Sequence, residues 1–179
     1  MQPNDIIEFW FEELSPKDWW KKNPELDARI SERFLSVHSQ AVCGELHDWR
    51  NTSHGRLAEI IVIDQFSRNM FRGKPESFAS DNVAVVLSQE AIRAGADKPL
   101  NNNERAFLYM PLMHSESRRV HELAMIMYDQ PGLENNFNFE KKHLAIIDRF
   151  GRYPHRNKIL GRTSTSEEIE FLQGPGSSF

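Results

Sequence analysis

Apolar residues recur at three- and four-residue steps along almost the whole chain, and this pattern limits the possible folds more than any other feature of the sequence. Residues 24–49 show it most clearly. The apolar positions there are Leu26, Ile30, Phe34, Val37, Ala41 and Leu46. Such spacing is typical of a helix that buries one face, whereas a strand requires alternation with a period of two. No segment alternates convincingly, because the apolar run at residues 60–63 is itself embedded in a helical pattern. The sequence therefore predicts an all-α protein.

Local start and stop signals divide the chain into helices. The predicted main helices cover residues 5–14, 24–49, 53–71, 80–94, 103–113, 115–129 and 139–150, and shorter ones cover 154–160 and 166–172. Asn4, Asn23 and Ser115 are the expected caps, and Pro24 suits a first helical position. Thr165 and Glu168 have the spacing of a capping box at the start of the last helix. Gly95 suits a left-handed terminator, and Pro111 should kink or shorten its helix.

Short connections between these helices predict antiparallel pairs, packed either as a compact bundle or as a small solenoid of helix hairpins. No clean 34-residue repeat is visible, so a solenoid would be degenerate. A chain of 179 residues is long enough to bury one core. We therefore predict a single helical domain over residues 1–179, with a basic segment at 141–162 and a tail at 173–179.

Composition favours a cytoplasmic protein. Cys43 is the single cysteine, so no intramolecular disulfide can form, and its helical context predicts a small core residue. The first five residues lack the features of a signal peptide, and no apolar run approaches the length of a membrane span. We therefore expect no membrane association.

The highest density of charge lies in residues 141–162, which contain seven Lys or Arg and one acid. The whole chain carries a formal charge of −4, so this segment concentrates positive charge in an acidic molecule. Pro154 restricts the backbone next to His155 and Arg156, which are therefore presented from a stiff turn. Arginine on a rigid element suits a planar anion, so the segment predicts contact with a ligand or with carboxylates of the protein itself.

Polar side chains also share stripes on predicted helices. Asp64, Arg68 and Arg72 follow one another at four-residue steps, and Asn69 lies on the adjoining stripe. This set predicts either a functional network or a local ion pair between Asp64 and Arg68. His143 shares an apolar stripe, which favours a core histidine over a general base.

His114, Arg118 and His121 fall on one further stripe, with Glu116 beside them. A metal site is disfavoured because the four-residue histidine pairing of a zinc helix is absent. A polar pocket and a helix-capping role for Glu116 both remain open.

Other templates fail. The sequence contains no glycine-rich phosphate loop, nucleotide-binding fingerprint, nucleophile elbow or paired-cysteine metal motif. The acidic remainder of the chain makes nucleic acid an unlikely partner. We predict no cofactor, and the oligomeric state is not predicted.

The strings IDQFSRNMFRG, LYMPLMHSE, RFGRYPHRNKILGRTSTSEEIEFL and PGSSF resemble a bacterial family known as domain of unknown function 924. The resemblance implies an all-helical fold similar to tetratricopeptide-type (TPR) repeats and no established activity. The motif positions it carries over are Asp64, Gln65, Arg68, Asn69, Arg72, Gly73, His114, Ser115, Glu116, His143, Arg149, Phe150, Gly151, Arg152, Pro154, His155, Arg156 and Asn157.

Three functions follow as hypotheses. The first is a pocket for an anionic small molecule or a chain terminus, lined by Arg68, Arg72, Arg152 and Arg156, with His114, Glu116 and His155 nearby. The second is a hydrolase or transferase in which His155 or His114 acts as general base and Glu116 orients it. The third is a non-catalytic module that binds a peptide in a helical groove. We also expect the C-terminal Phe179 either to dock its carboxylate on Arg152 or Arg156 or to be disordered.

Overall fold

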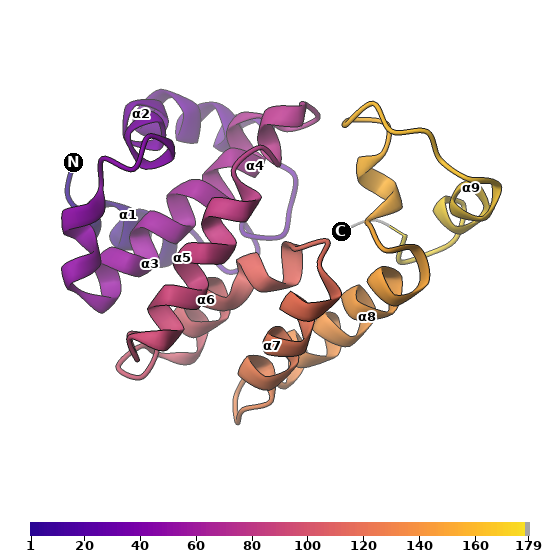
Figure 1. The fold of residues 1–179 in the computed structure, drawn as a ribbon. Helices are drawn as coiled ribbons and strands as arrows, with labels where there is room; N and C mark the ends of the chain where they lie inside the picture. Colours follow the sequence, from indigo (N-terminus) through magenta and orange to yellow (C-terminus); the bar gives the residue numbers. More distant parts are fainter. Residues whose placement is uncertain (178–179) are drawn as a thin grey trace. The chain divides into compact units, whose positions relative to one another are not determined.

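The computed structural model describes residues 1–177, and within this range it contains helices and no strand (Figure 1). The chain divides into two compact units. Unit 1 comprises Met1–Arg72 and Glu76–Pro111, and unit 2 comprises Gly73–Pro75 and the chain from Leu112 onward. The all-α prediction is confirmed. The single domain and the TPR-like arrangement stay predictions.

Unit 1 is built from the N-terminal helices. Its elements are α1 (Pro3–Glu8), the π-helical segment η1 (Phe9–Glu13), α2 (Pro24–Val42), the 3-10 segment η2 (His47–Asn51), α3 (Ser53–Ile61), the π-helical segment η3 (Val62–Phe66), α4 (Ser67–Met70), α5 (Asp81–Arg93) and α6 (Asn102–His114) up to Pro111. The short 3-10 segment η4 (Pro75–Ser77) spans a boundary between the two units.

Aromatic side chains fill the core of unit 1. The rings of Phe9 and Phe34 lie 4.7 Å apart and those of Phe34 and Phe66 lie 4.8 Å apart. Trp10 contacts both Phe66 and Phe107. These rings come from η1, α2, η3 and α6, so the core joins segments that are distant in sequence.

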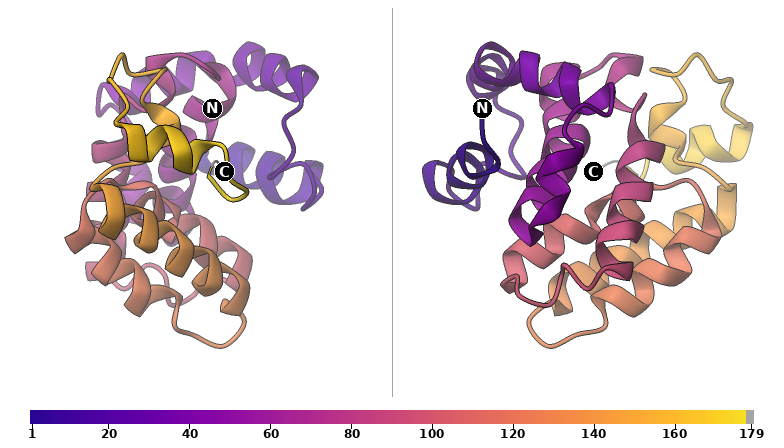
Figure 2. Two further views of the ribbon diagram at one scale, coloured as in Figure 1. Left: turned by 90° about the vertical axis from the view of Figure 1, so that its right-hand side faces the viewer. Right: turned by 60° about the vertical axis from the view of Figure 1, so that its left-hand side comes forward.

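Unit 2 contains a helical hairpin followed by short elements. Helices α7 (Arg118–Tyr128) and α8 (Glu134–Phe150) pack side by side (Figure 2). The 3-10 turn η5 (Pro154–Arg156) and α9 (Ser166–Leu172) come next. Ile146, Ile147 and Tyr153 form a buried cluster, against which Phe150 and Phe171 pack.

Several local signals operate as predicted. Asn23 caps α2 by accepting hydrogen bonds from the backbone of Glu25 and Leu26, with Pro24 at the first helical position. Gly95 follows α5 with φ of +67°. Thr165 and Glu168 form the reciprocal capping box of α9. Each signal acts within a few residues, which explains why sequence pattern alone identified it.

Other predicted boundaries were wrong. The first helix is capped by Gln2 and begins at Pro3, so Asn4 is inside it. Helix α2 ends at Val42 because Gly44, at φ of +76°, lets the backbone fold back on the last turn. Helix α7 is capped at Ser117 rather than at Ser115. Helix α8 begins at Glu134, five residues before the predicted start.

The predicted helix over residues 53–71 is helical, but its middle is the π-helical segment η3. A π-helical turn accommodates one extra residue and rotates the following side chains relative to a regular α-helix. Pro111 lies inside α6, which continues to His114 instead of ending early.

Three further observations bear on the predictions. Cys43 is exposed, which corrects the prediction of a core residue, because it lies at the C-cap where α2 ends. None of the helices within residues 1–177 has the length and apolar character needed to cross a membrane. The predicted docking of Phe179 lies outside the described residues.

Candidate anion-binding site

Tyr153 is the centre of a polar cluster in unit 2. Gly151 ends α8 in the left-handed conformation, with φ of +67°, and turns the chain toward Tyr153. The tyrosine is fully buried. Its backbone N–H donates to Glu116 Oε1 at 2.7 Å, and its hydroxyl donates to the carbonyl oxygen of Met113 at 2.6 Å. The segment after α8 is thus held in one conformation by contacts from Met113 and Glu116.

Three imidazoles and one guanidinium surround the Tyr153 ring. The ring centroids of His155, His143 and His121 lie 5.6, 5.9 and 6.3 Å from that of Tyr153. Arg156 Cζ lies 4.7 Å from the same centroid. Arg156 also donates a hydrogen bond to the carbonyl oxygen of His114 at 2.9 Å. The second and third sequence strings therefore meet at Tyr153.

His121 and Glu140 form a buried pair beside the tyrosine. His121 Nδ1 lies 2.6 Å from Glu140 Oε1, and both side chains are fully buried. His121 Nε2 lies 2.8 Å from the carbonyl oxygen of Ser115 and 3.2 Å from the Tyr153 hydroxyl oxygen. A carbonyl oxygen only accepts, so Nε2 carries a proton. Burial raises the pKa of Glu140, and Glu140 Oε2 is buried without a hydrogen-bond partner.

His143 is neutral at physiological pH. Its Nδ1 donates to the carbonyl oxygen of Phe139 at 2.8 Å. Burial, together with the nearby His114, His121 and His155, lowers the pKa of His143 to about 3, although the bond to Phe139 opposes the shift. A neutral imidazole of this kind does not supply positive charge to a ligand.

The carboxylate of Glu116 is held by hydrogen bonds from two other residues of unit 2. Arg162 donates two hydrogen bonds to its carboxylate, at 2.6 and 2.9 Å, and Tyr153 N–H supplies a third. Burial would raise the pKa of Glu116, but these hydrogen bonds lower it below the ordinary value. Both carboxylate oxygens are thus committed to Arg162 and Tyr153.

Arg152 makes a second forked ion pair. Its guanidinium donates to Glu168 at 2.7 and 2.8 Å and to the carbonyl oxygen of Thr163. Arg152 lowers the pKa of Glu168 to about 2. Because Glu168 also belongs to the capping box of α9, this pair attaches the helix start to the basic segment. Arg149 pairs with Glu167 at the exposed surface.

Asn157 closes the loop between η5 and α9. It is buried, donates to the Ser164 hydroxyl at 3.0 Å and accepts from Arg162 at 2.9 Å. Of these three consecutive residues, His155 and Arg156 therefore lie beside the Tyr153 ring, whereas Asn157 holds the loop together.

Residues 63–72 of the first sequence string lie in unit 1, where its arginines pair with carboxylates. Arg68 donates to Asp81 at 3.0 and 3.1 Å and lies 3.3 Å from Asp64. Asn69 and Arg72 both donate to Asp27. The predicted Asp64–Arg68 ion pair is present, and Arg68 also joins it to Asp81.

The predicted stripe of His114, Arg118 and His121 does not exist. Helix α6 ends at His114 and α7 starts at Arg118, so a turn separates them. Arg118 is exposed and pairs with Glu122 and Asp148, whereas His121 is buried. Among the described residues, no group of three or more His, Cys, Asp or Glu side chains is arranged to hold a metal ion.

Sequence reasoning gave no site role to Glu140, Tyr153, Arg162 or Glu168. The capping-box spacing marked Glu168, and the basic segment included Arg162. Nothing in the sequence paired His121 with Glu140, because the two residues lie on different helices.

The fold and the cluster define a helical protein with a polar centre in unit 2. Residues 6–176 match the family described as "Bacterial protein of unknown function (DUF924)", and the chain belongs to this family. The chain is similar to a solved protein of unknown function, ATU0120 from Agrobacterium tumefaciens, with 35% sequence identity and a TM-score of 0.92. That match covers 96% of this chain and 97% of the other. No curated protein matches the sequence.

Proposed function

We propose that unit 2 binds an anionic group, a carboxylate or a phosphate, at the face of the Tyr153 cluster formed by Arg156, His155 and His114. The observation that carries this proposal is that the His155 ring and the Arg156 guanidinium both lie beside the buried Tyr153. Arg156 also reaches the backbone carbonyl oxygen of His114, which belongs to another sequence string. Guanidinium and imidazolium groups are the side chains that bind such anions through charged hydrogen bonds.

Arg152 and Arg162 belong to the frame of the proposed site and not to its binding face. Arg152 is paired with Glu168 and Arg162 with Glu116, so these forks act as the frame of the proposed site. The frame holds the loop that presents His155 and Arg156. A guanidinium that is fixed on a ring and a backbone carbonyl loses little freedom when an anion binds, which favours affinity.

Two of the three residues that are proposed to bind the anion are partly accessible to solvent. His114 and His155 are half-buried, whereas Arg156 is buried. Such an arrangement suits an anion that enters past the imidazoles and meets the guanidinium at depth. Partial burial also strengthens the interaction, because the local dielectric constant is lower than in water.

The enzymatic alternative has less support. It requires Glu116 to orient a histidine base, but the carboxylate of Glu116 accepts its hydrogen bonds from Arg162 and Tyr153. No specific contact favours the peptide-binding alternative. We therefore propose binding rather than catalysis.

Titration calorimetry of the full chain with inorganic phosphate and with acetate tests the proposal. We expect the His155→Gln and Arg156→Lys variants to weaken binding by about tenfold or more, since each removes a charged or forked hydrogen bond. Arg149→Gln is the matched control, because it removes an exposed cation of the same basic segment. Equal affinity in wild type, His155→Gln and Arg156→Lys would contradict the proposal.

A further inference from the structure

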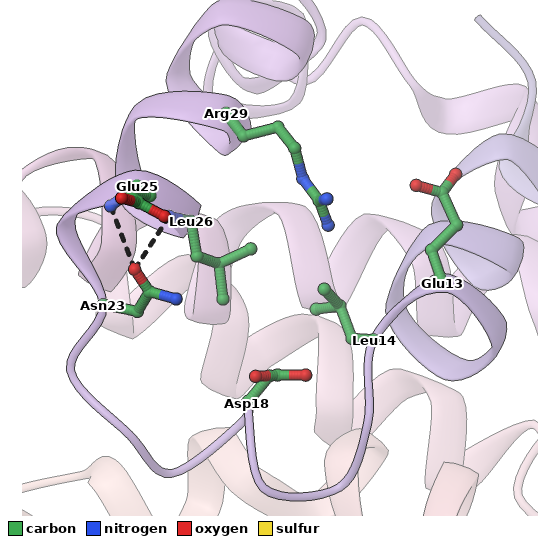
Figure 3. Close-up of a pocket in the computed structure, with 7 residues that line it drawn as sticks. All are labelled: Glu13, Leu14, Asp18, Asn23, Glu25, Leu26 and Arg29. Atoms are coloured by element: carbon green, nitrogen blue, oxygen red, sulfur yellow. Dashed lines mark hydrogen bonds between the residues drawn. The ribbon is translucent and has the colours of Figure 1, made fainter.

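Charged groups that the proposed function does not use lie in both units. Unit 1 contains a pocket between the end of η1 and the first turns of α2 (Figure 3), but polar surface side chains form most of its lining. Its two leucines, Leu14 and Leu26, are almost wholly buried, whereas small-molecule sites are mostly apolar. Unit 2 contains the fully buried pair of His121 and Glu140, which lies beside the proposed anion site.

The pair contacts a turn that is fixed at four consecutive residues. Helix α6 ends at His114, and the last carbonyl groups of a helix have no partner within that helix. The carbonyl oxygens of residues 113, 114 and 115 and the carboxylate of Glu116 each accept a hydrogen bond from another segment of unit 2. In this order the donors are the Tyr153 hydroxyl, the Arg156 guanidinium, His121 Nε2 and the Tyr153 backbone N–H.

His121 holds the turn only while its Nε2 atom carries a proton. A carbonyl oxygen accepts and never donates, so the 2.8 Å contact between Nε2 and Ser115 requires N–H at this atom. A neutral imidazole then has an acceptor at Nδ1, which lies 2.6 Å from Glu140 Oε1. Two arrangements fit this contact. Either Glu140 is a carboxylic acid that donates to Nδ1, or an imidazolium donates to a carboxylate.

The second oxygen of Glu140 favours the carboxylic acid. Oε2 is buried and has no hydrogen-bond partner among the described residues. A buried carboxylate with one oxygen lacking a hydrogen bond is costly, because a charge removed from water needs compensating bonds. A neutral carboxyl group loses much less when one oxygen stays without a partner. Burial also raises the pKa of Glu140, which acts in the same direction.

We propose that Glu140 is a neutral carboxylic acid and acts as a positioning residue of the anion site. Its Oε1–H donates to His121 Nδ1 and so fixes the tautomer that carries the proton on Nε2. The Nε2–H group donates to the carbonyl oxygen of Ser115 and holds the turn that carries His114. The inference rests on the proposed function, since it concerns the placement of one anion-binding imidazole. Neither Glu140 nor His121 contacts the anion.

NMR of the imidazole rings of the full chain tests the proton assignment without any anion. Long-range proton–nitrogen correlation spectra at pH 7 distinguish the two neutral tautomers from the imidazolium. We expect His121 to be neutral with its proton on Nε2. The His121→Phe variant, which keeps an aromatic ring, identifies the signals. An imidazolium at His121, or a neutral ring with its proton on Nδ1, overturns the proposal even if no variant of Glu140 folds.

Two substitutions of Glu140 separate its donor from its volume. Glu140→Gln keeps a donor, because the amide N–H can bond to Nδ1, whereas Glu140→Leu has a similar size and no donor. In calorimetry with acetate and inorganic phosphate, we expect Glu140→Gln to bind within about threefold of wild type. Glu140→Leu should bind about tenfold more weakly or worse. Equal affinity in wild type and Glu140→Leu, or the same loss in both variants, overturns the proposal.

Hydrogen exchange separates failure of this inference from failure of the proposed function. The Tyr153 amide, which donates to Glu116, should exchange faster in Glu140→Leu than in wild type or Glu140→Gln. Glu122→Gln, at an exposed position of α7, is the control and should match wild type. If wild type binds neither anion, the proposed function fails, while the His121 tautomer and the exchange rates still decide whether Glu140 fixes the turn. Unchanged exchange in Glu140→Leu overturns that role.

Discussion

At the scale of single residues, the pair formed by Glu140 and His121 is the clearest source of pH dependence in unit 2. The 2.6 Å contact between Glu140 Oε1 and His121 Nδ1 requires one proton between the two atoms. The folded pair therefore keeps this proton, whether it is written on the carboxyl or on the imidazole. Burial raises the pKa of Glu140, in keeping with a folded state that holds the proton.

The number of bound protons then differs between the folded and unfolded states. In an unfolded chain an imidazole loses its proton above about pH 6.5 and a carboxylate gains one below about pH 4.3. Unfolding therefore releases a proton above the first value and takes one up below the second. The free energy of unfolding contributed by this pair should be greatest between these limits and should fall on either side.

We predict that wild type loses stability above pH 7 more steeply than the double variant Glu140→Gln, His121→Gln. The difference in slope should approach about 1.4 kcal/mol per pH unit. Urea unfolding at pH 6, 7 and 8.5 measures it. His47→Gln is the control, because His47 is an exposed histidine. Parallel pH dependence in wild type and the double variant would mean that the pair holds no proton of its own.

At the scale of secondary-structure elements, α3 and η2 approach each other closely at Gly55. A Cβ atom added to Gly55 would lie 1.9 Å from the backbone oxygen of Trp49 and 2.9 Å from Thr52 Oγ1. Because the first contact is with backbone, no side-chain rotation can relieve it. The glycine is required here by space and not by a left-handed backbone.

We predict that Gly55→Ala destabilises the protein by more than about 3 kcal/mol, although alanine normally favours a helix over glycine. Gly151→Ala provides the comparison. At φ of +67°, and with no neighbouring atom within 4 Å of its added Cβ, it should cost only about 1–2 kcal/mol of left-handed strain. Denaturant unfolding of the two variants measures the difference. A mild effect at Gly55 would refute the close approach.

The element boundaries illustrate what sequence pattern can predict. Asn23 and the Thr165–Glu168 box were identified because a cap acts on backbone groups two or three residues away. The end of α2 was missed because apolar spacing continues to Leu46 after Gly44 has turned the chain. The π-helical segment η3, which packs on α2, has no comparable local signal.

At the scale of the whole molecule, several carboxylates are held ionised by forked arginines. Hydrogen bonds from Arg72 and Asn69 outweigh burial and lower the pKa of Asp27, and Arg162 does the same for Glu116. Arg152 lowers the pKa of Glu168 to about 2. These depressed values contribute stability that is present above the ordinary carboxyl pKa and is lost as the pH falls through the folded values.

We predict acid unfolding that steepens below about pH 4.5 and reflects these pairs. The Glu168→Gln variant should be less stable than wild type at pH 7, and the two should converge as the pH falls from about 4.5 to 2. Melting temperatures measured across this range test the prediction. Glu122→Gln, at an exposed pair, is the control and should follow wild type throughout. A constant difference between Glu168→Gln and wild type would contradict the assignment.

Some residues of the candidate site could be predicted from the local sequence, whereas their contacts with distant residues could not. The sequence marked His114, His155 and Arg156 because unusual polar residues gather in two strings, and folding brings these strings together at Tyr153. The sequence could not indicate that Glu116 forms an ion pair with Arg162 or that His121 contacts Glu140. Those contacts join residues that are 46 and 19 positions apart.

The sequence alone determined the all-helical class, most helix starts and the concentration of cations in residues 141–162. These properties depend on apolar spacing, caps and composition, which act over one or two helical turns. Only the tertiary structure decided which carboxylates pair with Arg68, Arg152 and Arg162 and which histidines are buried. Each of these depends on atoms from distant segments, and the energy of a charge is set by the neighbours and burial that folding provides.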